Sequence, residues 1–253
     1  MENAEVRHLA DSITVTANDA RPLAQAVTAL SEEFGWAIDF EDPPYYSKYD
    51  LVDDTAPQWR AAHPNTKGVT VIAGDTFQTQ FLKTPDTGTS QAEAERVLDS
   101  VVSDYNASAN PGRFTVRNEG DGRFAIVGRY VKDENGQDQT ISPILDTPIS
   151  IQEEIRDAYT TIETILNALT VKSQTKVAPF MMPQNALVQS QVTVGGQNVP
   201  ARVLLLQTLS AAKTKVYWRL YYDHNVKMYG FSLLPLARAN YDASGNRTTV
   251  LAP

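Results

Sequence analysis

The order of predicted helices and strands occurs twice along this chain of 253 residues. An extended apolar segment leads into an amphipathic helix, a second extended segment, a second helix and a hairpin with a polar turn. This order runs over residues 13–131 and again over residues 149–236. Alternation of strands with helices is typical of βαβ-type units. The sequence therefore predicts an α+β fold of two tandem units, each a small mixed sheet with two helices on one face.

The same pattern divides the chain into parts. We expect a first unit over residues 12–131 with a long insertion at 41–67, a linker over 132–147, a second unit over 148–238 and a flexible tail over 239–253. The linker is polar and contains an Asn-Gly pair, and the tail lacks an apolar period. Because an uncovered apolar sheet face is costly in water, the free face of each sheet must be solvated, pair with the other unit or meet a partner.

Local signals place individual elements. Pro22 suits the first turn of a helix, and Gly35 is a typical cap at its C-terminal end. Residues 36–40 then alternate as a strand, and residues 90–93 match the capping box that begins a second helix. The last hairpin is expected within residues 215–234, because a turn of Asp, His and Asn separates two aromatic-rich segments there.

Composition and charge narrow the class of protein. A hydrophobic content of 42% is that of a globular chain, and the net charge of −8 makes nucleic acid an unfavourable partner. Cysteine is absent from the sequence, which excludes disulfides and thiolate chemistry. No apolar run approaches the roughly 20 residues that span a bilayer, so membrane insertion is not expected. Residues 1–11 are polar, so an exported protein would have lost its signal peptide.

Few side chains form a pattern that would support catalysis. The acidic residues Asp39, Glu41 and Asp42 are candidates for an acid–base pair or a calcium site, but neighbouring carboxylates do not fix the separation that such a pair needs. We expect them to form a solvated strand end that discourages edge pairing. The three histidines lack the spacing of metal ligands: His8, His63 and His224. The sequence thus predicts no catalytic residue, no metal site and no cofactor.

Aromatic side chains gather in two places. The proline-rich insertion holds Tyr45, Tyr46 and Tyr49, and the predicted last hairpin holds a second group. Alternate residues of a strand point the same way, so Trp218 and Tyr222 share one face of that hairpin. We predict that these five residues bind a partner or ligand. The alternative is that both faces of the hairpin are buried between the two units.

Two stretches of the chain resemble a known module. Residues 21–30 (Arg-Pro-Leu-Ala-Gln-Ala-Val-Thr-Ala-Leu) and 34–40 (Phe-Gly-Trp-Ala-Ile-Asp-Phe) are similar to the short N-terminal domain shared by secretins and TonB-dependent transducers. In the second unit, residues 191–194, 198–201 and 205–209 resemble the second half of that domain. The resemblance implies a periplasmic, non-enzymatic module, present as two divergent copies, that docks onto another protein.

These observations lead to one principal hypothesis and to alternatives. We expect a non-enzymatic protein-interaction module of the bacterial cell envelope, periplasmic or secreted, whose partner is another envelope protein. The first alternative is a carbohydrate- or small-ligand-binding protein that uses exposed tyrosine and tryptophan side chains. The second is a hydrolase with an Asp/Glu pair. A cytoplasmic location is the alternative that the missing signal peptide leaves open.

Overall fold

The computed structural model describes residues 4–88, 90–241 and 247–251, and its architecture is α+β, as predicted. The first half of the chain contains, in order, β1 (Glu5–His8), β2 (Ser12–Asn18), α1 (Pro22–Phe34), β3 (Ala37–Glu41), β4 (Leu51–Asp53), α2 (Pro57–Ala62), β5 (Thr70–Ile72), β6 (Thr76–Leu82), α3 (Gln91–Ala107), β7 (Arg113–Gly120) and β8 (Arg123–Lys132).

The second half begins with two short elements, β9 (Asp138–Thr140) and the 3-10 helix η1 (Ile144–Asp146). It continues with β10 (Pro148–Asp157), α4 (Ala158–Ser173), β11 (Lys176–Met181), α5 (Gln184–Val188), β12 (Gln191–Pro200), α6 (Ala201–Ala211), β13 (Val216–Asp223), β14 (Met228–Pro235), β15 (Ala237–Tyr241) and β16 (Arg247–Leu251).

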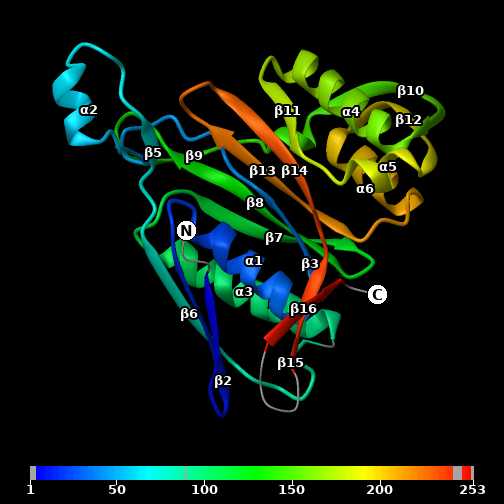
Figure 1. The fold of residues 1–253 in the computed structure, drawn as a ribbon, viewed down its shortest axis with the longest axis horizontal. Coiled ribbons are helices and arrows are strands. Elements are labelled where there is room, and N and C mark those ends of the chain that lie inside the picture. Colours follow the sequence, from blue (N-terminus) through cyan, green and yellow to red (C-terminus); the bar gives the residue numbers. More distant parts are fainter. Residues whose placement is uncertain (1–3, 89, 242–246, 252–253) are drawn as a thin grey trace.

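One mixed sheet joins the two halves of the chain (Figure 1). Its strand order is β11-β14-β13-β3-β8-β7, and β9 pairs with β8 outside this path. The halves meet where β13 lies parallel to β3, with Arg219 opposite Phe40 and Leu220 opposite Glu41. The prediction of a separate mixed sheet in each unit is therefore wrong, because both halves contribute three strands of this path to the same sheet.

The helices cover opposite faces of this sheet. In the first half, α1 and α3 bury Ile38 and Phe40 of β3 in one hydrophobic cluster. In the second half, α4 and α6 bury Trp218 and Phe231 of β13 and β14 in another. Because successive side chains of a strand alternate between faces, Asp39 points away from α1 and α3. Each helix pair thus covers one face of its own half of the sheet. The opposite face of that half is left free by these helices.

Smaller sheets complete the two halves. In the first, β2 pairs antiparallel with both β1 and β6, and in the second β10 pairs antiparallel with β12. A short ribbon of β4 and β5 extends from the first half. It carries α2, which projects from the body (Figure 1) and buries none of its residues.

Local sequence signals fix the helix ends. Pro22 occupies the first turn of α1, and Gly35 ends that helix with left-handed backbone at a φ of 73°, so both predictions are confirmed. The helix α3 begins where the capping box predicts, but the side chain of Ser90 makes no capping hydrogen bond. The carboxylate of Glu93 instead accepts hydrogen bonds from the guanidinium of Arg96, one turn further along the helix.

Three parts that were expected to lack regular structure contain short elements. The insertion at 41–67 holds β4 and α2, and the linker holds β9 and η1. The predicted flexible tail begins inside a ribbon of β15 and β16, and its residues 242–246 and 252–253 lie outside the described residues. Apolar periodicity is weak in these segments, because strand partners rather than burial in a core define them.

Buried tyrosines give the fold a measurable response to high pH. Burial raises the pKa of Tyr45, Tyr105 and Tyr229 above the ordinary value of 10.0, and nearby carboxylates raise it further. The unfolded chain therefore releases these protons first. We expect the free energy of unfolding to fall as the pH rises above that value, by about 1.4 kcal/mol per pH unit for each tyrosine.

A spectrophotometric titration checks this expectation. Tyrosinate absorbance from the buried side chains should appear together with the loss of near-ultraviolet circular dichroism, because these groups ionise only when the chain unfolds. Ionisation of all the tyrosines while the dichroism stays native would contradict the burial of these three.

Candidate functional site

The acidic residues at the end of β3 lie in the contact between the two halves of the chain. Asp39, Glu41 and Asp42 are buried, with exposed fractions of 0%, 1% and 2%. Each carboxylate accepts a hydrogen bond from a backbone amide of the second half. These bonds run from Trp218 to Asp39 at 2.8 Å, from Leu145 to Glu41 at 3.1 Å and from Tyr222 to Asp42 at 3.1 Å. The carboxylates thus act as hydrogen-bond acceptors where the short β3–β13 pairing ends.

An arginine accompanies each of these carboxylates. Arg123 Nη1 lies 2.9 Å from Asp39, Arg21 Nε lies 2.6 Å from Asp42, and Arg202 pairs with Glu41. Burial raises the pKa of each carboxyl group, and the positive charge of its arginine opposes that rise. The prediction of a solvated strand end is wrong, because β13 and α6 cover this end of β3. All three carboxylates considered for an Asp/Glu pair are therefore already paired with arginine side chains of this protein.

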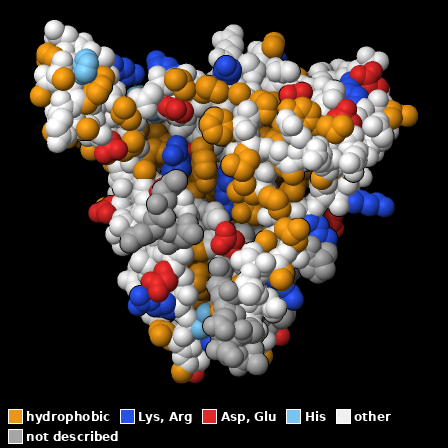
Figure 2. All heavy atoms as spheres, viewed as in Figure 1, with side chains coloured by type: hydrophobic (Ala, Val, Ile, Leu, Met, Phe, Trp, Pro, Cys, Tyr) orange, Lys and Arg blue, Asp and Glu red, His pale blue; other side chains and the backbone are white. Residues whose placement is uncertain are grey.

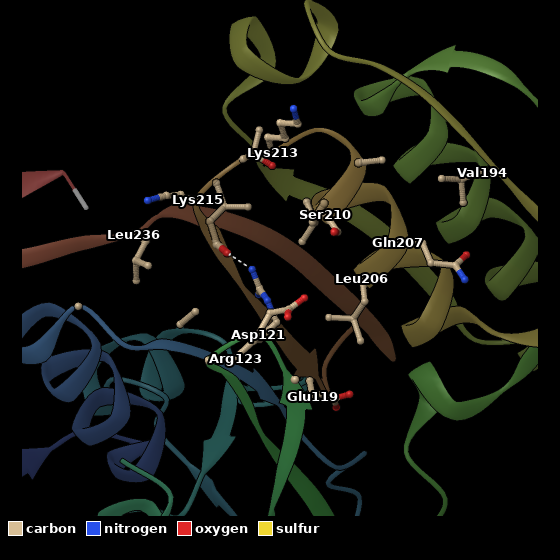
Figure 3. A pocket seen from close by; sticks show the side chains of 18 of the residues that line it. Glu119, Asp121, Arg123, Val194, Leu206, Gln207, Ser210, Lys213, Lys215 and Leu236 are labelled. Atoms are coloured by element: carbon tan, nitrogen blue, oxygen red, sulfur yellow. Dashed lines mark hydrogen bonds between the residues drawn. The ribbon is translucent and has the colours of Figure 1, made fainter. Parts of the chain in front are cut away.

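A wide cleft of about 1150 Å³ lies beside this contact (Figure 3). The tip of the β7–β8 hairpin and the C-terminal end of α6 border it. Glu119 and Asp121 line the cleft together with Lys213 and Arg123, and Arg123 is already bound to Asp39. Because acidic and basic side chains are mixed around it, the cleft offers a ligand no surface of a single charge sign.

A second hollow, of about 530 Å³, lies on the side of β13 and β14 opposite their buried core residues. We call it the groove. The β4–β5 ribbon borders one side, and Phe180 of β11 lies over Gly230 on the other, with its ring 3.7 Å from where a Cβ at 230 would stand. Its lining residues are Ala20, Arg21, Tyr45, Leu51, residues 69–72, Phe180, residues 221–226, Met228, Gly230 and Ser232.

Apolar side chains of the groove are exposed to solvent. Phe180 is 83% exposed, Val226 61% and Val69 56%. Next to Phe180 along β11, Met181 is 59% exposed. Figure 2 shows hydrophobic side chains gathered over the strands of this region. A contiguous exposed apolar surface of this kind is typical of a site that binds another molecule.

The structure brings together two of the five predicted binding residues. Tyr45 and Tyr222 both border the groove, but Tyr45 is only 2% exposed, and the ring of Tyr222 packs on Tyr229 against the second core. Tyr46 donates a hydrogen bond to Gln139, and the ring of Tyr49 lies under the Lys48 ammonium at 5.1 Å, so both belong to the neighbouring loop surface.

The prediction is wrong for Trp218, whose side chain is 0% exposed in the core beneath α4 and α6. The aromatic hairpin therefore turns the face of Trp218 into that core, whereas the alternative held that both faces are buried between the two units. Arg219 points to the opposite face, where its guanidinium bonds to the hydroxyl of Thr28 at 2.8 Å and stacks on Tyr217 at 4.4 Å.

Sequence reasoning missed Phe180 and Met181. They belong to the apolar run Val-Ala-Pro-Phe-Met at 177–181, in which Pro179 interrupts the usual strand pattern. A comparison of the two halves, once the structure aligns them, singles out Phe180. Counted from the left-handed residue that ends each preceding helix, Gly35 or Gln174, Phe180 occupies the position that Glu41 occupies in β3. An aromatic residue in place of a carboxylate marks that position as different.

The remaining candidate groups lie apart from one another. His8 pairs with Glu33, His63 stacks on Trp59, and His224 Nδ1 lies 3.1 Å from the carbonyl oxygen of Tyr45 at the groove. Across residues 4–88, 90–241 and 247–251, no group of three or more histidine or acidic side chains is placed to hold a metal ion. In the same part of the chain, no helix has the length and hydropathy to cross a membrane. In comparisons with protein families, curated proteins and solved structures, none matches this chain.

Proposed function

We propose that this protein is a non-enzymatic interaction module of the bacterial cell envelope and that another envelope protein binds in the groove. The observation that carries the proposal is Phe180, a ring 83% exposed beside further apolar side chains on an open sheet face. Full burial of such a side chain contributes about 1.5–3 kcal/mol. The folded chain alone forgoes that contribution, and a protein that covers the face would recover it on binding.

The periplasmic or secreted location is part of the same proposal. It is supported by the resemblance of residues 21–30 and 34–40 to the short N-terminal domain of secretins and TonB-dependent transducers. The net charge of −8 agrees with a protein partner rather than a nucleic acid. We also propose that the two halves are divergent copies of one unit, which the matching strand orders β3-β8-β7 and β11-β14-β13 support.

Binding of a glycan or small ligand is the second candidate. The groove volume of about 530 Å³ lies within the range of roughly 300–1,000 Å³ typical of ligand pockets, and Tyr221 is among its aromatic lining residues. A ligand that binds only the folded state raises the melting temperature. Thermal-shift screening against glycans therefore separates this candidate from a protein partner.

The change Phe180→Asp tests the principal proposal. We expect it to weaken binding of the envelope partner by roughly 30-fold, the equivalent of about 2 kcal/mol for an aromatic anchor at the centre of an interface. The measurement is a pull-down from periplasmic extract, followed by titration of the captured protein. Because Phe180 is exposed, the melting temperature should stay close to that of the unmodified protein.

The matched control is Val171→Asp, which adds the same charge at a residue of α4 that is 80% exposed and lies outside the groove. This variant should bind as the unmodified protein does. Equal binding by the two variants would remove the groove from the proposal.

A further inference from the structure

We propose that the partner presents an amphipathic helix, which lies across the open face of β11 and β14 and does not add a strand to the edge of the sheet. This inference rests on the proposed function and names the binding mode of the same groove. It follows from two observations: the edge of β11 is blocked, and a helix of this chain covers the corresponding face in the first half.

The free edge of β11 is closed to strand addition. The amide of Val177 donates to the hydroxyl oxygen of Thr170 at 2.9 Å, and that hydroxyl donates to the carbonyl oxygen of Val177 at 3.3 Å. Two residues further, Pro179 has no amide hydrogen to offer. An incoming strand would find both groups of Val177 engaged and no donor at Pro179.

The opposite end of the sheet has a similar device. The side-chain amide of Asn106, on α3, donates to the carbonyl oxygen of Phe114 at 2.8 Å and accepts from its backbone amide at 2.9 Å. A helix side chain thus occupies backbone groups of both edge strands, β7 and β11. Main-chain pairing with a partner is therefore disfavoured at either end.

A helix covers the corresponding surface in the first half. When the two halves are aligned on the left-handed residues Gly35 and Gln174, the buried Val177 matches Ile38, and Phe180 matches Glu41. The side chain of Glu41 is covered by α6 and pairs with Arg202 of that helix. The matching residue in the second half, Phe180, is 83% exposed. The first half therefore shows that the corresponding sheet face of the repeat accepts a helix.

The chemistry of the open face defines which helix fits. Where the first half has Asp39 and Glu41, the second has Ala178 and Phe180, so the occupant must present apolar side chains and not an arginine. A helix laid on a sheet contacts it with residues three and four apart. The partner helix therefore carries an apolar stripe at that spacing.

A second copy of this chain does not fit that description. In the repeat, α3 is the counterpart of α6, because the two helices bury residues at the same spacing. The buried residues Ala201, Leu204, Leu205 and Thr208 of α6 correspond, in that order, to Ala94, Val97, Leu98 and Val101 of α3. In this alignment the α3 residues that match Arg202 and Leu206 are Glu95 and Asp99. Their carboxylates would lie against the ring of Phe180, which is unfavourable for both. This rules against α3 of a second copy, and we take the occupant to be a helix of a different protein.

Photocrosslinking measures the binding mode directly. A benzophenone side chain is placed at position 180 or, in a second variant, at position 232, which also lines the groove. Each full-length protein is irradiated in periplasmic extract, and the crosslinked residues of the adduct are mapped by mass spectrometry. Residues of the partner that are three, four or seven positions apart support a helix, whereas a spacing of two overturns it in favour of a strand.

Other outcomes separate this inference from the function on which it rests. No protein adduct from either position overturns the proposed function itself, and an adduct between two copies of this chain overturns the heterologous partner. The double variant Thr170→Ala, Pro179→Ala frees the edge of β11. The adduct yield should stay unchanged if the partner lies on the face, and a severalfold increase would show that it pairs with the edge.

Discussion

Replacement of Arg202 by methionine is expected to lower the free energy of unfolding by about 3–5 kcal/mol. Arg202 is 3% exposed, pairs with Glu41 and lies 3.1 Å from the carboxylate of Asp146. Methionine fills part of the same space but leaves the buried Glu41 without its cation, and a buried charge without a partner is strongly unfavourable. Urea denaturation with linear extrapolation measures the change.

The control is Arg96→Met. Arg96 also forms an ion pair, with Glu93 at 2.6 Å, but its side chain is 46% exposed, so the loss should stay below about 1 kcal/mol. Adding Glu41→Gln to the Arg202 variant should recover part of the stability, because the unpaired charge is removed. Equal losses for the two methionine variants would show that the contact between the halves does not depend on this pair.

The second large effect is expected for Trp218→Ala, which should cost about 3–5 kcal/mol of unfolding free energy. The side chain is 0% exposed, and its ring centre lies 6.4 Å from that of Phe231. Its removal leaves a cavity between the sheet and the helices α4 and α6. Thermal and urea denaturation should both record the loss.

The comparison variant is Tyr49→Ala, since this side chain is 51% exposed and its loss should change stability by no more than about 0.5 kcal/mol. Trp218 and Tyr49 were both plausible contact residues from the sequence. A Trp218→Ala protein with unchanged stability and weakened partner binding would restore the role in binding that its burial contradicts.

Local periodicity was sufficient for the elements that bury an apolar face. It predicted α1, with its proline start and glycine end, and placed the last hairpin within one residue of the observed strands at 216–223 and 228–235. It failed for β1, β9 and the β15–β16 ribbon. These strands are exposed or half-buried along most of their length, so neighbouring strands define them and no core stripe marks them.

The contact between the halves could not be predicted from local pattern. Alternation along β3 correctly places Ile38 and Phe40 in the core and Asp39 on the other face. What covers that other face depends on Trp218, whose backbone amide binds Asp39 across 179 positions of sequence. Without knowledge of that pairing, a short run of carboxylates is most simply explained as solvated.

The exposed apolar face was anticipated only in general terms. From the sequence, the free side of each sheet was expected to be solvated, to pair with the other unit or to meet a partner, and the two halves differ in this respect. In the first half, α6 covers it through Arg202 and Glu41. In the second half, the groove beside Phe180 stays open. The difference depends on the pairing of β13 with β3, which a single sequence does not reveal.

The late pairing of β3 bears on how the chain matures during translation. Residues 37–41 are synthesised long before β13, their neighbour on one side. Until then we expect Asp39 and Glu41 to face water, where their charges oppose premature aggregation of the nascent first half. Once β13 docks, both carboxylates are buried and Glu41 pairs with Arg202 of the second half, so they serve solubility first and cohesion afterwards.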